Sequence, residues 1–144
     1  MDEMKKIFSG IEYDEAAGSY IVPKRDLPNV CKYVKDTDDL SFDYLKCLTA
    51  VDYAEKVEVV YELYSFKLNL GIKIKVALMP NDLKLPSVVS FWAAADWFER
   101  EVYDMFGIVF EGHPDLKRIL LDDGWKGHPL RKDYTDERIV KKPS

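Results

Sequence analysis

The sequence contains few of the residues that build metal and redox centres. It has two cysteines, Cys31 and Cys47, two histidines, no CxxC pair and no Cys/His cluster. Zinc and iron–sulfur sites need several such ligands close together, so we expect no metal site made by this chain alone. Both cysteines lie in apolar patterns, which predicts reduced core residues and agrees with a cytosolic setting.

Long apolar runs and nucleotide-binding loops are also absent. No stretch approaches the roughly 20 apolar residues of a membrane-spanning helix. The N-terminal MDEMKKIFSG lacks the apolar segment of a signal peptide. Phosphate-binding glycine loops, the serine-hydrolase elbow and the HExxH zinc motif are missing too. Attachment to a membrane would therefore need another subunit.

Length and charge narrow the class of protein. The 144 residues suffice for one domain with its own core, and the net charge of −5 argues against nucleic-acid binding. The charge is uneven, because residues 126–144 hold more Lys and Arg than Asp and Glu. A basic tail on an acidic body fits docking onto another surface, and solvated charge is the plainer alternative.

Hydrophobic periodicity predicts two early elements. A short strand is expected at 19–22, and a helix begins near Asp26, which could cap it. The apolar face of this helix follows i, i+3, i+4, i+7 spacing: Leu27, Val30, Cys31 and Val34.

Residues 44–79 alternate with a period of two, which predicts three strands. The inward sets are Leu45, Cys47, Thr49, Val51; then Val57, Val59, Tyr61, Leu63; then Ile72, Ile74, Val76, Leu78. The second and third strands form an antiparallel hairpin with its turn near 69–71. Their outer face carries Glu58, Glu62, Lys73 and Lys75, which predicts cross-strand ion pairs on a solvated face.

After a loop at 80–86, the sequence predicts its longest helix over about 88–106, capped by Ser87 and stopped by Gly107. Its apolar stripe is Val88, Phe91, Ala95, Phe98, Val102 and Phe106. The opposite face carries a ladder of Asp96, Arg100 and Asp104. Glu99 and Glu101 fall at the edges of the stripe and are expected to be half-buried. They then need partners from the C-terminal tail or another chain.

The predicted fold class is α+β, an antiparallel sheet of three or more strands packed on one face by two helices. A short strand is expected at 108–110. From Gly112 on, the chain is rich in Gly, Pro, aromatic and basic residues, which predicts an ordered but irregular arm. We therefore expect residues 1–111 to form a single domain and residues 112–144 an extended C-terminal docking arm.

A few residues could carry chemistry. Glu101 and Asp104 are i, i+3 neighbours and could act with His113 as an acid–base pair in a small free-standing enzyme. That hypothesis requires a deep pocket at the C-terminal end of the long helix, and structural pairing of the carboxylates is the alternative. His113 and His128 each precede proline, and we expect each imidazole to bond a backbone group in a turn.

The remaining candidates point to interfaces. Trp97 projects near the polar side of its helix, which makes it a possible interface anchor, whereas Trp92 is expected in the core. Residues 131–133 (RKD) could bind a phosphate or an acidic headgroup. Arg131 could instead form a bidentate pair with Glu99 or Glu101, which would satisfy a buried carboxylate.

Residues 99–120 follow a fixed pattern of charged and apolar types. It reads Glu99-Arg100-Glu101, Asp104, Met105-Phe106, His113, Lys117 and Ile119-Leu120. The flanking stretches DMFGI, GHPDLKRILL and G-x-PLRKDY belong to the same pattern. This pattern resembles the signature of the 30 kDa subunit of respiratory complex I.

The resemblance implies a non-catalytic scaffold subunit in the peripheral arm of a proton-translocating NADH:quinone oxidoreductase. Such a subunit holds no cofactor of its own, because FMN and the iron–sulfur clusters belong to partner subunits. It packs on the hydrogenase-like large (49 kDa-type) subunit and other peripheral-arm iron–sulfur subunits. It lies on the cytoplasmic side of the cell membrane, touches the membrane only through the complex, and has no nucleic-acid partner.

The resemblance also implies which residues join domain, arm and neighbour. They are Glu99, Arg100, Glu101, Asp104, Gly107, His113, Pro114, Lys117, Arg118, Trp125, Gly127, Pro129, Leu130, Arg131, Lys132 and Asp133. The same motif resembles subunits of membrane-bound energy-converting hydrogenases, formate hydrogenlyases and F420-linked dehydrogenases, so the type of complex stays open. A lone interaction module without a respiratory role is a third hypothesis.

Overall fold

A computed structural model of the protein describes residues 2–117 and 127–130. The first elements are α1 (Asp2–Ile7), β1 (Glu12–Asp14), β2 (Ser19–Ile21), the 3-10 turn η1 (Lys24–Asp26) and α2 (Leu27–Asp36). Three long strands follow: β3 (Tyr44–Asp52), β4 (Val57–Ser65) and β5 (Leu70–Leu78). The last elements are β6 (Lys84–Pro86), α3 (Ala95–Phe106) and β7 (Val109–Glu111).

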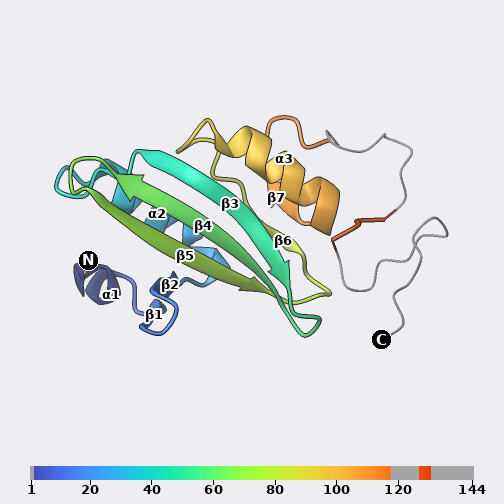
Figure 1. Ribbon diagram of the computed structural model, residues 1–144, viewed down its shortest axis with the longest axis horizontal. Coiled ribbons are helices and arrows are strands. Elements are labelled where there is room, and N and C mark those ends of the chain that lie inside the picture. Colours follow the sequence, from blue (N-terminus) through green and yellow to red (C-terminus); the bar gives the residue numbers. More distant parts are fainter. Residues whose placement is uncertain (1, 118–126, 131–144) are drawn as a thin grey trace.

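The main sheet has five strands in the order β1-β2-β5-β4-β3. β2 runs parallel to β5 and the other neighbours are antiparallel, while β6 and β7 form a separate parallel pair. Figure 1 shows α2 against one face of the sheet and α3 beside β3. The predicted α+β fold class is confirmed. Among the described residues, no helix is long and apolar enough to cross a membrane.

The hairpin of β4 and β5 follows the predicted alternation. Both predicted inward sets are buried throughout. Ser65 pairs with Leu70, so the turn spans 66–69 and begins earlier than expected. Glu62 faces Lys73, with Oε1 3.8 Å from Nζ, as predicted. Glu58 instead faces Ala77, and its Oε2 lies 3.7 Å from Nζ of Lys56 in the preceding turn, so the cross-strand pair predicted for Glu58 does not form among the described residues.

Strand β3 departs from its predicted alternation. Its register against β4 shifts between Leu45 and Cys47, and an extra residue in one strand turns the following side chains to the other face. The prediction that Cys47, Thr49 and Val51 point inward is therefore wrong, because Thr49 and Val51 are exposed and Cys47 is half-buried. The inward side chains are Leu45, Leu48, Ala50 and Asp52.

Helix α2 has the predicted buried face, Leu27, Val30, Cys31 and Val34. Asp26 precedes the helix, but its side chain makes no capping hydrogen bond, so that part of the prediction is wrong. Burial, with the Glu99 carboxylate nearby, raises the pKa of the Cys31 thiol well above its usual range. Cys31 is therefore a neutral core residue rather than a nucleophile.

The first part of the helix predicted over 88–106 is wrong. Helix α3 begins at Ala95, and residues 87–94 form turns in which Phe91 and Trp92 both donate backbone hydrogen bonds to the Val88 carbonyl. Turns of this kind share the i, i+3, i+4 spacing of a helix, so periodicity does not separate them. The loop expected at 80–86 ends in β6, and Ser87 continues from that strand instead of capping a helix.

Candidate docking site around α3

Glu99 fastens α3 to the turn that precedes it. The side chain is fully buried. Its Oε1 accepts a hydrogen bond from the Ser87 hydroxyl (2.5 Å) and its Oε2 accepts one from the Val88 N–H (2.8 Å). The expectation of a half-buried Glu99 that depends on the tail or another chain is therefore wrong. Burial raises the pKa of Glu99 above its usual 4.5, while the two hydrogen bonds act in the opposite direction.

The predicted ladder of Asp96, Arg100 and Asp104 is not a solvated face. Asp104 is fully buried, whereas the Asp96 side chain is 51% exposed. The Arg100 Nε is buried and has no hydrogen-bond partner among the residues that the structure describes. An uncompensated buried N–H donor costs free energy, so Arg100 requires an acceptor from beyond those residues.

His113 ties the loop after β7 to the first turn of α3. Its side chain is fully buried, and its Nδ1 accepts a hydrogen bond from the Asp115 N–H at 2.9 Å. With Nδ1 as acceptor, a neutral imidazole carries its proton on Nε2. That nitrogen lies 3.0 Å from Asp96 Oδ1 and 3.3 Å from the Asp96 carbonyl oxygen. The expected backbone bonding of this histidine is confirmed.

Residues 128–130 cap the C-terminal end of α3. His128 Nδ1 lies 3.0 Å from the Asp104 carbonyl oxygen, and the Leu130 N–H donates to the Met105 carbonyl at 2.9 Å. The last carbonyls of a helix lack partners within the helix, so these bonds satisfy them. Gly107 ends α3 as predicted, with a φ of 79°. A Cβ at this glycine would lie 2.6 Å from the His128 ring, which leaves room only for hydrogen.

A small hollow lies between β3 and the C-terminal half of α3. Its volume is about 60 Å³, and it is lined by Leu48, Thr49, Glu101, Val102, Met105, Phe106 and Leu130. Glu101 is on its wall, but Asp104 is not among its lining residues. The acid–base hypothesis needs both carboxylates in a deep pocket, so this geometry argues against it.

Two large apolar side chains near this region are exposed. Trp97 is 54% exposed and Leu130 is 56% exposed. Trp92 is buried in the core, and its indole N–H donates to the Phe42 carbonyl at 3.0 Å, which confirms its predicted role. Trp97 lies on the outside of α3, as the helical pattern predicted.

The remaining predicted joint residues lie closer to the surface. Lys117 pairs with Asp115 at 3.3 Å in an exposed position, and Pro114 and Gly127 are exposed. Pro129 is half-buried. Arg118, Trp125, Arg131, Lys132 and Asp133 lie outside the described residues, and so does the predicted pairing of Arg131 with a buried carboxylate.

Sequence reasoning missed Ser87 and Val88 as the partners of Glu99. They precede it by 12 and 11 residues, and no local spacing rule links residues so far apart. The described residues contain no group of three or more His, Cys, Asp or Glu that could hold a metal ion.

The fold and these contacts define a small α+β domain whose C-terminal segment is fastened to the end of one helix. Residues 20–139 match the family described as "Respiratory-chain NADH dehydrogenase, 30 Kd subunit". The chain therefore belongs to this family, which confirms the resemblance predicted from residues 99–120.

Similar proteins include NADH-quinone oxidoreductase subunits of the C type. The relative from Chloroherpeton thalassium is 45% identical over 109 residues, which cover 74% of this chain and 45% of that protein. The relative from Geotalea uraniireducens is 43% identical over 117 residues, covering 79% and 70% of the two chains. The combined C/D subunit of Nitrosospira multiformis is 38% identical over 157 residues, covering 93% and 26%. The chain thus spans less than half of some of the curated relatives it matches.

Two solved structures share the fold. The trypsin-resistant fragment (1-134) of Nqo5 superposes with a TM-score of 0.59 and 31% identity, covering 81% of this chain and all of the fragment. A chain of the membrane-bound sulfane sulfur reductase, an archaeal respiratory membrane complex, gives a TM-score of 0.79 at 24% identity, covering 93% and 82%. At that identity, the second likeness concerns the fold alone.

Proposed function

We propose that this protein is a non-catalytic scaffold subunit in the peripheral arm of a proton-translocating NADH:quinone oxidoreductase. Its membership of the 30 kDa family and its C-type relatives support this role in respiratory electron transport. In this proposal FMN and the iron–sulfur clusters belong to partner chains. The protein lies on the cytoplasmic side of the membrane and reaches the membrane only through the complex.

The observation that carries the proposal is the outer side of α3. Arg100 holds a buried N–H donor without an acceptor among the described residues, and Trp97 exposes 54% of its surface on the same helix. A neighbouring chain that covered the indole would remove this apolar surface from water. Arg100 follows Trp97 by three residues, about one turn of the same helix. Trp and Arg are also the residue types that contribute most at interfaces.

We assign the neighbour to the hydrogenase-like large (49 kDa-type) subunit, beside other peripheral-arm iron–sulfur subunits. The Nitrosospira multiformis relative supports a close neighbour for a C-type region. It is named as a C/D protein, and this chain covers only 26% of it, so a C-type region there is part of a longer polypeptide. Fusion places two regions in permanent proximity.

The joint extends from α3 into the C-terminal segment. We propose residues 1–111 as the domain and residues 112–144 as its docking arm. The bonds from residues 128–130 to the end of α3 support a fixed attachment at that point. The joint comprises Trp97 and the positions that the family pattern assigns to it, with Glu99 and His113 holding its inner side.

The proposal is tested by affinity co-purification of the tagged protein from mildly solubilised membranes. We expect Trp97→Ala and Glu101→Ala to reduce the recovery of partner chains at least about tenfold, the effect of about 1.4 kcal/mol. Tyr53→Ala, which removes a 46%-exposed ring from the β3–β4 turn, is the matched control and should leave recovery unchanged. Circular dichroism checks that each variant remains folded.

The co-purifying chains identify the complex. A flavin subunit that binds NADH supports the proposed oxidoreductase. A nickel–iron hydrogenase large subunit would overturn that assignment in favour of an energy-converting hydrogenase or formate hydrogenlyase. An F420-binding chain would overturn it in favour of an F420-linked dehydrogenase. Recovery of this protein alone, from the soluble fraction, would contradict the scaffold role.

A further inference from the structure

The turn between β4 and β5 lies far from α3 (Figure 1). Aromatic rings gather at this turn. Phe66 is 72% exposed, with its ring centroid 4.9 Å from that of Tyr64 and 5.8 Å from that of Tyr44. Leu68 and Leu70 extend the apolar surface, at 41% and 44% exposed. We call these five residues the hairpin tip. Exposed apolar clusters of this kind mark interaction sites more often than isolated apolar residues do.

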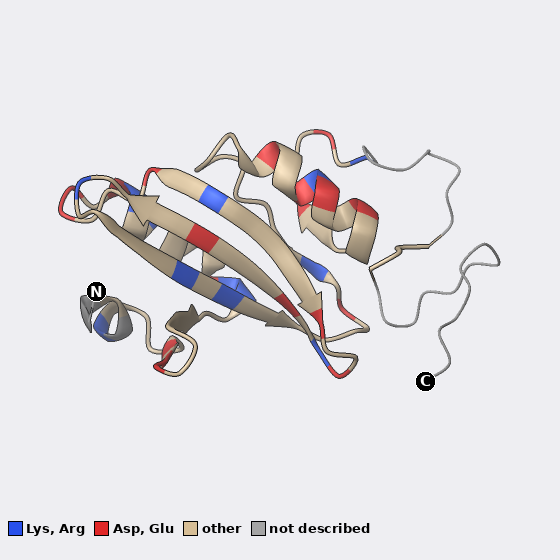
Figure 2. Ribbon diagram, in the orientation of Figure 1, with Lys and Arg blue, Asp and Glu red and all other residues tan. Residues whose placement is uncertain are grey.

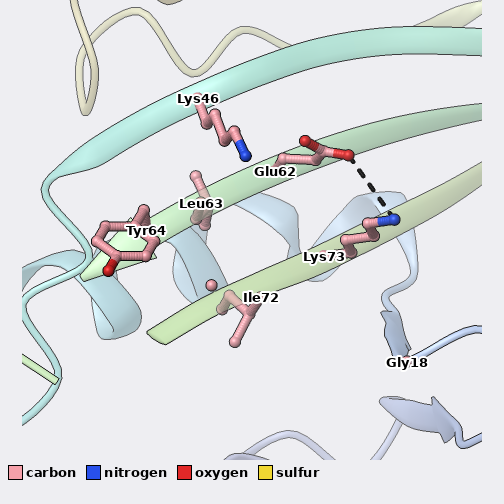
Figure 3. A pocket seen from close by; sticks show the side chains of 8 residues that line it. Gly18, Lys46, Glu62, Leu63, Tyr64, Ile72 and Lys73 are labelled. Carbon is pink, nitrogen blue, oxygen red and sulfur yellow. Dashed lines mark ion pairs between the residues drawn. The ribbon is translucent and has the colours of Figure 1, made fainter. Parts of the chain in front are cut away.

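Beside the rings, the outer face of the sheet is hollowed. The hollow has a volume of about 300 Å³ and is lined by Gly18, Lys46, Glu62, Leu63, Tyr64, Gly71, Ile72 and Lys73. Gly71 pairs with Tyr64 across the strands, and its missing side chain leaves space next to the ring. Figure 3 shows Glu62 between Lys46 and Lys73. Two lysines and one glutamate leave the hollow a formal charge of +1, so the hollow itself does not attract a basic segment.

Negative charge at this end of the molecule comes from the last residue of α2 and the loop that leads to β3. Residues 36–43 contain no Lys or Arg, and their four aspartates are all exposed: Asp36, Asp38, Asp39 and Asp43. The loop is held against the hairpin, because Lys67 Nζ lies 2.5 Å from the Asp38 carbonyl and Ser65 Oγ lies 2.5 Å from the Leu40 carbonyl. Figure 2 shows acidic positions at this end of the sheet.

We propose that the hairpin tip docks a basic segment of a partner chain, with an arginine over the exposed rings and its guanidinium turned to the carboxylates of residues 36–43. A guanidinium stacks on aromatic faces and forms forked bonds to carboxylates, so it matches both features. A purely apolar partner would desolvate the aspartates without pairing them. An anionic lipid surface would be repelled by them. The inference rests on the proposed assembly with other chains, but it concerns a second surface.

The test is site-specific photo-crosslinking in the assembled complex. Benzoylphenylalanine replaces Phe66 in the full-length tagged chain, the complex is purified and irradiated, and the joined peptides are identified by mass spectrometry. The matched control carries the same group at Tyr53, an exposed ring in the turn at the opposite end of β3. We expect position 66 to join a segment of another chain that contains arginine.

A charge variant tests the acidic contribution. Asp38→Asn together with Asp39→Asn keeps the side-chain shape and removes two charges, and we expect the crosslink yield from position 66 to fall at least threefold. An unchanged yield would overturn the proposal. So would adducts with lipid, crosslinks to a segment without Arg or Lys, or an intact complex without any crosslink from position 66. An intact complex without that crosslink would leave the scaffold role standing and would overturn only the docking at the hairpin tip.

Discussion

The sheet and helix α3 are held in place by different kinds of contact. β4, β5 and α2 meet through alternating apolar side chains, all buried at the predicted positions. α3 is fastened at three polar points: Glu99 to residues 87–88, His113 to its first turn, and residues 128–130 to its last carbonyls. Apolar contacts share their free energy among many neighbours, whereas each polar point depends on one donor and one acceptor.

This difference has a functional consequence. The scaffold role that we propose needs a stable body and a docking surface whose geometry is fixed. The sheet supplies the first, and the polar contacts around α3 hold the helix that presents Trp97 and Arg100. Substitutions in the sheet should therefore lower the stability of the whole domain. Substitutions around α3 should cost less stability, but they should disturb the end of the domain that carries α3 and weaken assembly with partner chains.

The largest effect on stability is expected in the sheet. Ile74→Ala empties a fully buried position between the Tyr61 and Tyr20 cross-strand neighbours. We expect it to lower the free energy of unfolding by about 2–5 kcal/mol, measured by urea denaturation. Thr49→Ala, at an exposed position of β3, is the control and should change it by less than about 0.5 kcal/mol. Equal losses of unfolding free energy in Ile74→Ala and Thr49→Ala would contradict the placement of Ile74 in the core.

Glu99→Ala should cost somewhat less. It removes the acceptor of the Ser87 hydroxyl and of the buried Val88 N–H, and we expect a loss of about 2–3 kcal/mol in the same measurement. Glu99→Gln keeps one acceptor oxygen and should cost less than the alanine variant. A glutamine variant as damaging as the alanine one would show that charge, rather than hydrogen bonding, fastens α3.

The pH dependence of the Glu99 contribution has a definite sign. Burial raises the pKa of Glu99 above its usual 4.5, so the folded protein binds this proton more tightly than the unfolded chain does. The contribution to stability is full below pH 4.5 and is lost as pH rises through the folded pKa. We expect the stability of the wild type minus that of Glu99→Gln to decrease as the pH rises above 4.5. A difference that grows with pH would refute it.

Gly107→Ala should have a smaller effect, localised at the end of α3. The left-handed backbone costs a residue with a Cβ about 1–2 kcal/mol, and the new methyl group would meet the His128 ring. Gly18→Ala is a matched control, since Gly18 has a φ of 64° but open space around a Cβ. The loss of stability in Gly107→Ala beyond that in Gly18→Ala measures how closely the His128 ring packs on Gly107. Equal losses in the two variants would mean that residues 128–130 are not fixed at the end of α3.

The smallest effect is expected on the outer face of the sheet. Glu62→Gln removes a partly exposed pair with Lys73 at 3.8 Å, and exposed ion pairs contribute little. We expect a change of at most about 0.5 kcal/mol, reduced further at high salt. A loss of unfolding free energy above about 1 kcal/mol would show that this ion pair stabilises the sheet as strongly as a buried contact does.

How far the sequence predicts the structure also differs between the two regions. Alternation predicted every buried position of β4 and β5 that was assigned inward, and helical spacing predicted the buried face of α2, because each pattern reflects a single apolar surface. The same reasoning failed in β3, where one extra residue near Cys47 reverses the alternation. It also failed at residues 88–94, because successive turns share the spacing of a helix.

The region around α3 was less predictable because its contacts join distant segments. The motif at 99–120 identified the family, and Gly107 marked the end of α3. The burial of Asp104 and the pairing of Glu99 with Ser87 depend on how β6, α3 and β7 pack, which no spacing rule encodes. Helical geometry alone placed Asp104 on a polar face and Glu99 at the edge of the apolar stripe. Both side chains are fully buried in the structure.

The most direct measurement compares the oxidation of tryptophans by hydroxyl radicals in the isolated chain and in the assembled complex. Trp97 is 54% exposed and Trp92 is 4% exposed, so Trp92 is an internal control for folding. The scaffold account predicts that assembly slows oxidation of Trp97 at least threefold while Trp92 stays protected in both samples. Equal oxidation of Trp97 in the isolated chain and in the complex would contradict the claim that the outer side of α3 is the joint.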